Sequence, residues 1–89
     1  KDDVKGVIRI LLEVATRHEL VLDDPAPCAA LENHGQSSLD YVLKVWTDKD
    51  NYWTVYYDLC TGVKEEFDLR GIEIPYPQMD IHIKENKTK

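Results

Sequence analysis

The sequence predicts an α+β domain of the ferredoxin-like kind, in which two helices cover one face of a mostly antiparallel sheet. Two stretches, residues 4–17 and 50–69, carry apolar residues at helical spacing, and alternating stretches that resemble strands lie between and after them. The order helix, strand, strand, helix, strand fits a βαββαβ plan whose opening strand would lie before Lys1. We expect residues 1–75 to form this domain and residues 76–89 to follow as a terminal strand and tail.

The amino-acid composition of the chain makes several classes of function less probable. The chain has 89 residues, with 17 acidic and 11 basic side chains and a net charge of −6. An acidic chain without a basic stripe is a poor candidate for binding nucleic acid or an anionic membrane surface. Its apolar windows are far shorter than the roughly 20 residues that cross a bilayer, so we expect no membrane-spanning segment in this piece. The start at Lys1, without an initiator methionine, indicates a piece excised from a longer protein.

The first helix is expected from about Val4 to Arg17, with Asp2 or Asp3 as its cap. Arg17 suits the negative end of the helix dipole. The predicted buried face comprises Val4, Val7, Ile8, Leu11, Val14 and Ala15.

The second helix is expected to begin at Asp50 or Asn51 and to run to about Leu69. Gly71 should end it, because glycine readily adopts the left-handed conformation that follows many helices. The one internal glycine, Gly62, indicates close packing. The predicted buried stripe comprises Tyr52, Val55, Tyr56, Leu59, Val63 and Phe67.

The second helix also carries a second apolar row, formed by Trp53, Tyr57 and Cys60. A helix resting on a sheet in a small monomer needs one apolar stripe, so a second row favours a contact with another protein. Trp46, on the outer face of the central strand, would belong to the same contact. The alternative is that Trp46 and Trp53 cover the edge of the sheet within one chain.

Strands are predicted at residues 28–33 and 39–47, joined by a hairpin connection at residues 34–38. A short strand is expected at residues 72–74 before a Pro-x-Pro corner, because proline cannot sit within a regular ladder. After the corner, apolar residues alternate with polar ones, as in a strand with one dry face. No strand is left in the chain to pair with this terminal strand, so we expect its partner to lie outside the chain.

No recognisable catalytic or metal-binding motif occurs. A nucleophile with a neighbouring base would require a cysteine close to a histidine in the fold. The candidates are Cys28, Cys60, His18, His34 and His82. Asp80 and His82, two residues apart on one side of the terminal strand, could hold a metal, but a solvated polar face explains them more simply. We predict no catalytic residues, no metal, no cofactor and two free thiols.

Two connected motifs carry a family resemblance. The sequence contains Asp50-x-Tyr52-Trp53-x-Val55-Tyr56-x-Asp58-Leu59 with Lys64-x-x-Phe67, followed by Gly71-Ile72-Glu73-Ile74-Pro75-Tyr76-Pro77-Gln78-Met79-Asp80. Together these closely resemble the C-terminal end of small-conductance mechanosensitive ion channels, the MscS family. The resemblance runs from about Asp2 to Ile83, nearly the whole chain.

The resemblance implies a role in a channel that releases ions and small solutes on osmotic downshock. Seven identical subunits would build a cytoplasmic cage below a pore in the inner membrane, and this piece would support assembly and solute access, not conduction. The terminal segments of the subunits would pair as a parallel barrel. The implied barrel residues are Tyr76, Pro77, Gln78, Met79, Asp80, Ile81, His82 and Ile83, with the strand ending at about Lys84.

A free-standing ferredoxin-like regulatory or protein-interaction module is the alternative function. Such modules usually offer a glycine-rich loop or a cluster of polar groups at a subunit boundary. The loop of that type here, residues 34–38, is short. Apolar stretches of about 20 residues upstream of Lys1 would favour the channel.

Overall fold

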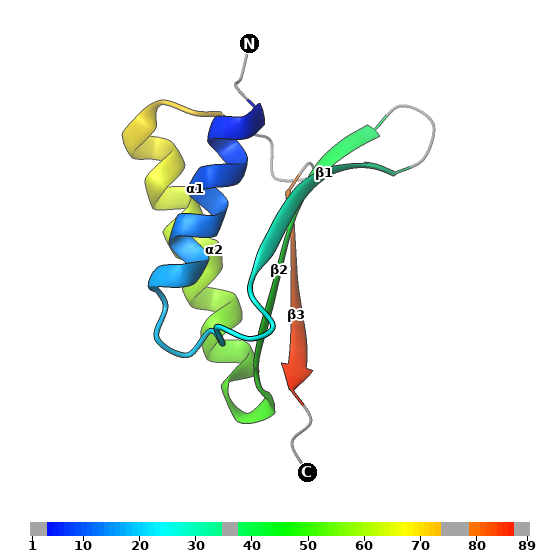
Figure 1. The fold of residues 1–89 in the computed structure, drawn as a ribbon. Coiled ribbons are helices and arrows are strands. Elements are labelled where there is room, and N and C mark those ends of the chain that lie inside the picture. Colours follow the sequence, from blue (N-terminus) through cyan, green and yellow to red (C-terminus); the bar gives the residue numbers. More distant parts are fainter. Residues whose placement is uncertain (1–3, 35–37, 74–78, 87–89) are drawn as a thin grey trace.

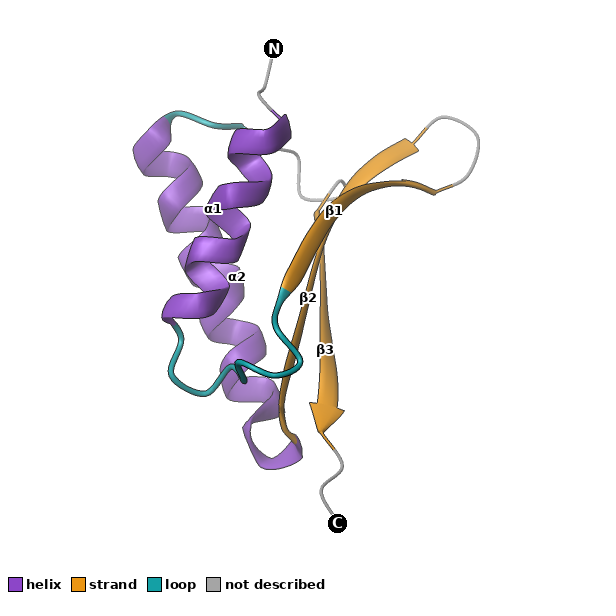
Figure 2. Ribbon diagram, viewed as in Figure 1, coloured by secondary structure: helices purple, strands orange, loops and turns teal. Residues whose placement is uncertain are grey.

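The computed structural model describes residues 4–34, 38–73 and 79–86, which form a helix layer and a strand layer (Figure 1). The elements are α1 (Val4–Arg17), β1 (Cys28–His34), β2 (Ser38–Asp48), the 3-10 turn η1 (Lys49–Asn51), α2 (Tyr52–Arg70) and β3 (Met79–Asn86). Both helices lie on the same face of the sheet (Figure 2). The predicted α+β fold is confirmed, and the arrangement is compatible with the ferredoxin-like plan.

α1 forms over the predicted range because its apolar residues recur at steps of three and four. Its buried residues are Val7, Ile10, Leu11, Val14 and Ala15. The buried face differs slightly from the predicted one, since Ile10 is buried, Ile8 is partly buried and Val4 is 38% exposed. Successive residues of a helix are about 100° apart around its axis, so when Val7 faces the core Ile8 lies at the margin of the buried face. The predicted caps lie outside the described residues.

α2 begins at Tyr52, directly after the predicted cap Asn51, whose side chain makes no capping hydrogen bond. The buried residues are Val55, Leu59, Val63 and Phe67. Tyr52 and Tyr56 are half-buried at the margin of this face. A Cβ atom at Gly62 would lie 3.1 Å from Cγ1 of Val14. The prediction of close packing at this glycine is therefore confirmed, and the contact is with α1.

The end of α2 is closed by a glycine, as predicted. Gly71 adopts the left-handed conformation, with φ 69° and ψ 27°. The N–H groups of Gly71 and Ile72 donate to carbonyl oxygens of the last helical turn, at 3.3 and 2.9 Å. Because the Ile72 amide closes the helix in this way, Ile72 and Glu73 lie outside any strand. The prediction of a strand at residues 72–74 is wrong for these two residues, and Ile74 lies outside the described part of the chain.

β1 and β2 form the predicted hairpin, antiparallel, with Ala30 opposite Val42. β2 is the central strand of the order β1-β2-β3. Along β2 the side chains that face the helices belong to the buried core, as Leu43 and Val45 do at 0% exposure. The buried Thr47 continues this side, and its hydroxyl donates to the carbonyl oxygen of Leu20 at 2.6 Å. That bond ties the loop after α1 to the end of β2.

β3 pairs with β2 of the same chain, in parallel, with Ile81 opposite Leu43. The prediction that the terminal strand finds no partner within the chain is therefore wrong. α2 carries the chain back along the sheet, so the strand that follows it runs parallel to β2 and can satisfy the second edge of that strand. The sheet is consequently mixed, with one antiparallel and one parallel pair.

Candidate subunit-contact surfaces

A row of aromatic rings lies on the solvent side of α2. Trp53 and Tyr57, one helical turn apart, stack with ring centroids 5.8 Å apart and an interplanar angle of 29°. Each of the two side chains is 61% exposed. Tyr52 and Tyr56 support the row by edge contacts with the Trp53 ring at 5.0 and 5.9 Å. Two large exposed rings held in one orientation are typical of a protein-contact surface.

Trp46 lies apart from this row. It sits between Val45 and Thr47 on β2, both of which face the helix layer, so the Trp46 side chain is on the opposite, helix-free face of the sheet. The side chain is half-buried, and its backbone carbonyl accepts the Leu22 N–H at 2.8 Å. No ring contact joins Trp46 to Trp53 in the described residues. The sequence placed Trp46 on the correct face, but the structure does not bring the two tryptophans together.

The predicted barrel residues fall partly in β3. Tyr76, Pro77 and Gln78 lie outside the described residues. Met79, Ile81 and Ile83 are partly buried against the core, whereas Asp80 and His82 are exposed and hydrogen-bonded at 3.2 Å (Oδ2 to Nε2). The alternation predicted from the sequence is confirmed, with the dry face towards the helices.

An apolar groove, which sequence reasoning missed, runs between α2 and β3. Its volume is about 1200 Å³. The apolar lining comes mainly from Tyr56, Cys60, Val63, Phe67, Met79 and Ile81. Apolar periodicity placed these residues on one side of their own elements, but it does not reveal that α2 and β3 together line one groove.

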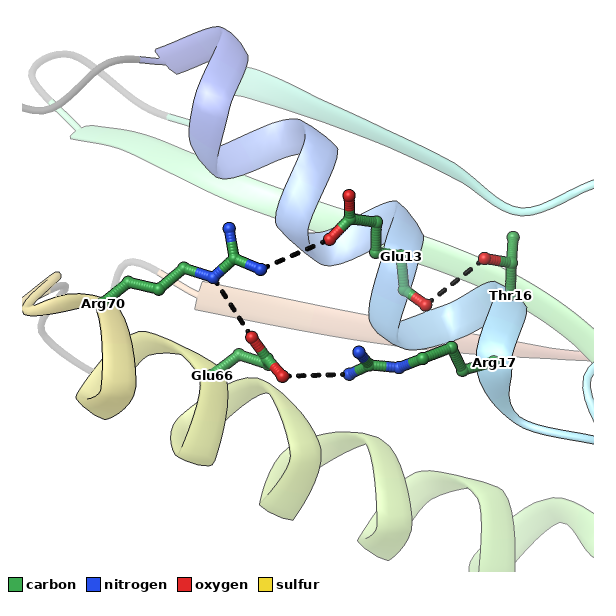
Figure 3. Close-up of polar contacts among 5 residues, drawn as sticks. All are labelled: Glu13, Thr16, Arg17, Glu66 and Arg70. Atoms are coloured by element: carbon green, nitrogen blue, oxygen red, sulfur yellow. Dashed lines mark hydrogen bonds and ion pairs between the residues drawn. The ribbon is translucent and has the colours of Figure 1, made fainter.

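Glu66 connects the two helices (Figure 3). Its carboxylate accepts hydrogen bonds from Nη2 of Arg17 in α1 at 3.2 Å and from Nε of Arg70 at 3.1 Å. Arg70 also approaches Glu13 of α1 at 3.5 Å. The hydrogen bonds from Arg17 and then Arg70 hold the pKa of the Glu66 carboxyl below its ordinary value of 4.5. This network positions α2 against α1.

The chemically active side chains do not converge on a reactive centre in the described residues. His18 is linked to Asp58 of α2 at 2.7 Å and accepts the Leu20 N–H at Nδ1, so in the neutral ring the proton is on Nε2, directed at Asp58. Both cysteines are free; Cys28 is exposed on β1 and Cys60 lies in α2. No group of three potential metal ligands was found among the described residues.

Comparison with known proteins shows the family to which the chain is similar. Residues 1–74 match the family described as "Mechanosensitive ion channel MscS, C-terminal". The chain is 36% identical over 81 residues to the "Small-conductance mechanosensitive channel" of Edwardsiella ictaluri. It is 32% identical over 77 residues to an uncharacterised MscS family protein of Archaeoglobus fulgidus, and 30% identical over 89 residues to one of Synechocystis sp..

These alignments cover 91, 86 and 100% of this chain but 28, 27 and 30% of the respective relatives. The chain thus spans less than a third of the length of the relatives it matches. In the described ranges, neither helix has both the length and the apolar character needed to cross a bilayer. The match to the family ends at residue 74, so β3 lies beyond it, although the alignment with the Synechocystis protein includes the tail. The chain therefore belongs to the MscS family of mechanosensitive ion channels and matches the C-terminal domain of that family.

Proposed function

We propose that this chain is part of the cytoplasmic cage of a mechanosensitive channel in the inner membrane, which releases ions and small solutes on osmotic downshock. In this role it supports the assembly of seven identical subunits and the access of solutes, while the pore belongs to another part of the protein. Residues 1–75 form the wall of the cage and residues 76–89 its terminal strand and tail. The net charge of −6 would bias which solutes enter, through the local field rather than through binding.

The observation that carries the proposal is β3, a strand that follows the family-matched region and pairs with β2 along one edge, while its other edge pairs with no strand in residues 4–34, 38–73 and 79–86. Both edges of every strand are paired in a closed barrel, so a barrel at the base of the cage removes the free edge. A strand from Tyr76 to Lys84 would be about 30 Å long at roughly 3.3 Å per residue. To join such a barrel, β3 has to leave β2.

The exposed side chains support a ring of subunits. A cyclic assembly uses two different patches on each subunit, because the front of one copy meets the back of the next. Trp53 and Tyr57 lie on the helix layer, and Trp46 lies on the helix-free face of the sheet. Their positions on opposite layers suit contacts with two different neighbours.

A chimeric channel tests the proposal. The segment of the Edwardsiella ictaluri channel that aligns with this chain would be replaced by this chain and expressed in cells that lack their own small-conductance channels. We expect seven-subunit particles and improved survival of osmotic downshock. Removal of residues 76–89 should reduce both, since the barrel strand is lost.

Point variants in the same chimera test the contact surfaces. Trp53→Ser combined with Tyr57→Ser should weaken assembly, whereas Leu69→Ser, at a site that is 80% exposed, is the matched control on the same helix. Assembly that is unchanged after removal of residues 76–89 would contradict the barrel role. Failure of the intact chimera to assemble at all would contradict the cage role.

A further inference from the structure

The aromatic row of α2 lies on the side of that helix that faces away from α1. The close approach of Gly62 to Val14 marks the side of α2 that faces α1. Successive residues are about 100° apart around a helix, so Trp53 and Tyr57 lie about 180° and about 140° away from Gly62. Both rings are exposed. A partner of the aromatic row therefore has to approach α2 from the side opposite α1.

The turn that joins α1 to β1 lies on the α1 side of the molecule, at the level of the same rings (Figure 1). His18, at its start, is linked to Asp58, the neighbour of Tyr57, at 2.7 Å. The carbonyl oxygen of Leu20 accepts a hydrogen bond from β2 at 2.6 Å, and the Leu22 N–H donates to β2 at 2.8 Å. The turn is therefore held at one height by α2 and by β2.

The tip of this turn, residues 23–27, exposes a rigid apolar surface. Pro25 and Ala26 are exposed, and Pro27 is half-buried. Each proline fixes its own φ, so the tip loses little conformational entropy when it binds. Rows of aromatic rings are common receivers of proline-containing segments. Asp23 and Asp24 are exposed, and their carboxylates can accept hydrogen bonds from an indole N–H and a phenol O–H.

The charges around the two surfaces are compatible. Asp23 and Asp24 form no ion pair with another described residue, and neither does the exposed Lys49 just before α2. Lys49 can pair with these carboxylates in a second copy, and the positive end of the α2 dipole favours them as well. Asp50 offsets part of this attraction, so the contact of the rings with the prolines has to supply most of the affinity.

We infer that the aromatic row of each copy packs on the tip of the turn, residues 23–27, of the next copy around the ring. This inference rests on the proposed function, because it needs a ring of identical subunits, and it names the surface that receives the row. A cyclic ring brings one side of a copy against the opposite side of the next at the same height, which is how the row and the turn are placed. The receiving surface extends to Trp46, whose carbonyl oxygen accepts the Leu22 N–H.

Photo-crosslinking in the chimeric channel tests this contact. A photoreactive phenylalanine, p-benzoylphenylalanine, in place of Tyr57 keeps an aromatic ring in the row. We expect cross-linked species that extend from two copies up to seven, because each copy in a head-to-tail ring both offers a row and receives one. Mass spectrometry should place the cross-links in residues 23–27. The same photoreactive residue in place of Glu65, exposed on α2 outside the row, is the control and should give no such ladder.

A charge at the tip of the turn provides the second test. Ala26→Glu places a carboxylate against the ring faces and should raise the dissociation constant between subunits by roughly tenfold. Ala26→Ser is the matched control and should leave it unchanged. In the Ala26→Glu background, Trp53→Ser combined with Tyr57→Ser should cause little further loss, because both changes remove the same contact.

The outcomes separate this contact from the cage role. Particles of seven subunits whose cross-links fall outside residues 23–27 would overturn the contact and leave the cage role intact. Additive effects of Ala26→Glu and the two ring variants would overturn it as well. Cross-linked dimers without larger species would contradict the head-to-tail order. A chimera that does not assemble would overturn the cage role and the contact together.

Discussion

β1 and β3 are both edge strands paired with β2, but they reach that position in different ways. β1 joins β2 through a short connection, and its antiparallel register runs from Cys28 opposite Lys44 to His34 opposite Ser38. β3 returns only after the whole of α2 and pairs in parallel. A hairpin is a local structure that its own sequence can specify, whereas a parallel pair requires a crossover to be packed first.

The two edges also differ in how they are covered. Both carry partly buried apolar side chains against the core, such as Ala29 and Leu31 on β1 and Met79 and Ile83 on β3. The groove under α2 is open along β3. The apolar side chains of β3 that pack against the core are at least as large as those of β1, so burial does not make β3 the weaker edge. β3 is joined to β2 only across α2, whereas β1 and β2 follow each other in the chain, so we expect β3 to open separately from the hairpin.

The largest effect on stability is expected at a residue of β2 that pairs with both edge strands. Leu43 is fully buried in the central strand, and its partners are Ala29 on β1 and Ile81 on β3. Leu43→Ala should lower the free energy of unfolding by about 2–5 kcal/mol, measured by urea denaturation, because it leaves a cavity between both strands and the helices. Leu69→Ala, at an exposed site, should change it by less than about 0.5 kcal/mol. Equal effects of the two variants would contradict the observed core.

A disulfide between β2 and β3 should have the next largest effect. Lys44 and His82 are partners on the helix-free face, and neighbouring strands are about 4.8 Å apart, within the range that a disulfide spans. Lys44→Cys with His82→Cys should form a disulfide that stabilises the chain by about 2–4 kcal/mol relative to its reduced form. Cys28 and Cys60 are first replaced by serine, because Cys28 is the partner of Lys44 on the other side.

The control for this disulfide shifts the register. Lys84→Cys in place of His82→Cys puts the second thiol opposite Trp46 instead of residue 44, and it should form the bond poorly. Preferential formation of the shifted bond, measured on a non-reducing gel, would show that the register of β3 is different.

A smaller, local effect is expected for Ile81, which packs against the core from the β3 edge. Ile81→Ala should destabilise the chain by about 1–2 kcal/mol, less than full burial would give, because the side chain is only partly buried. Hydrogen exchange should accelerate in β3 while the β1–β2 hairpin stays protected. His82→Ala, on the exposed face, is the control. Equal acceleration in β1 would mean that the two edges do not open separately.

The smallest effect on stability is expected for Glu66. This residue connects the two helices, so its replacement should affect the β1 and β3 edges equally. The pKa of its carboxyl is lower in the folded chain than the ordinary 4.5, so the unfolded chain binds the proton more tightly. Its stabilising effect is therefore present above that ordinary value and is lost as the pH falls through the lower folded pKa. Glu66→Gln should make Tm less dependent on acid pH, whereas Glu65→Gln, its exposed neighbour, should leave the profile unchanged. A steeper profile for Glu66→Gln would contradict the network in Figure 3.

Local patterns were enough to predict much of the fold. The helix bounds, the hairpin, the glycine that ends α2 and the alternation along β3 depend on residues close together in the chain. The β2–β3 pairing, the groove and the contact of Glu66 with Arg17 were not predictable, because each joins segments separated by a whole element. The prediction of a strand at residues 72–74 was wrong at Ile72 for a related reason. The Ile72 N–H already donates to a carbonyl oxygen at the end of α2, so it is not available to a neighbouring strand.

The spacing of apolar side chains indicated which residues of each helix and strand face the core, because helices repeat every 3.6 residues and strands every 2 residues. It did not specify that β3 would pair with β2, that α2 and β3 would line one groove, or that Trp46 and Trp53 would lie on opposite layers. Those features follow from packing, since a free main-chain edge can pair with any strand that the fold brings beside it.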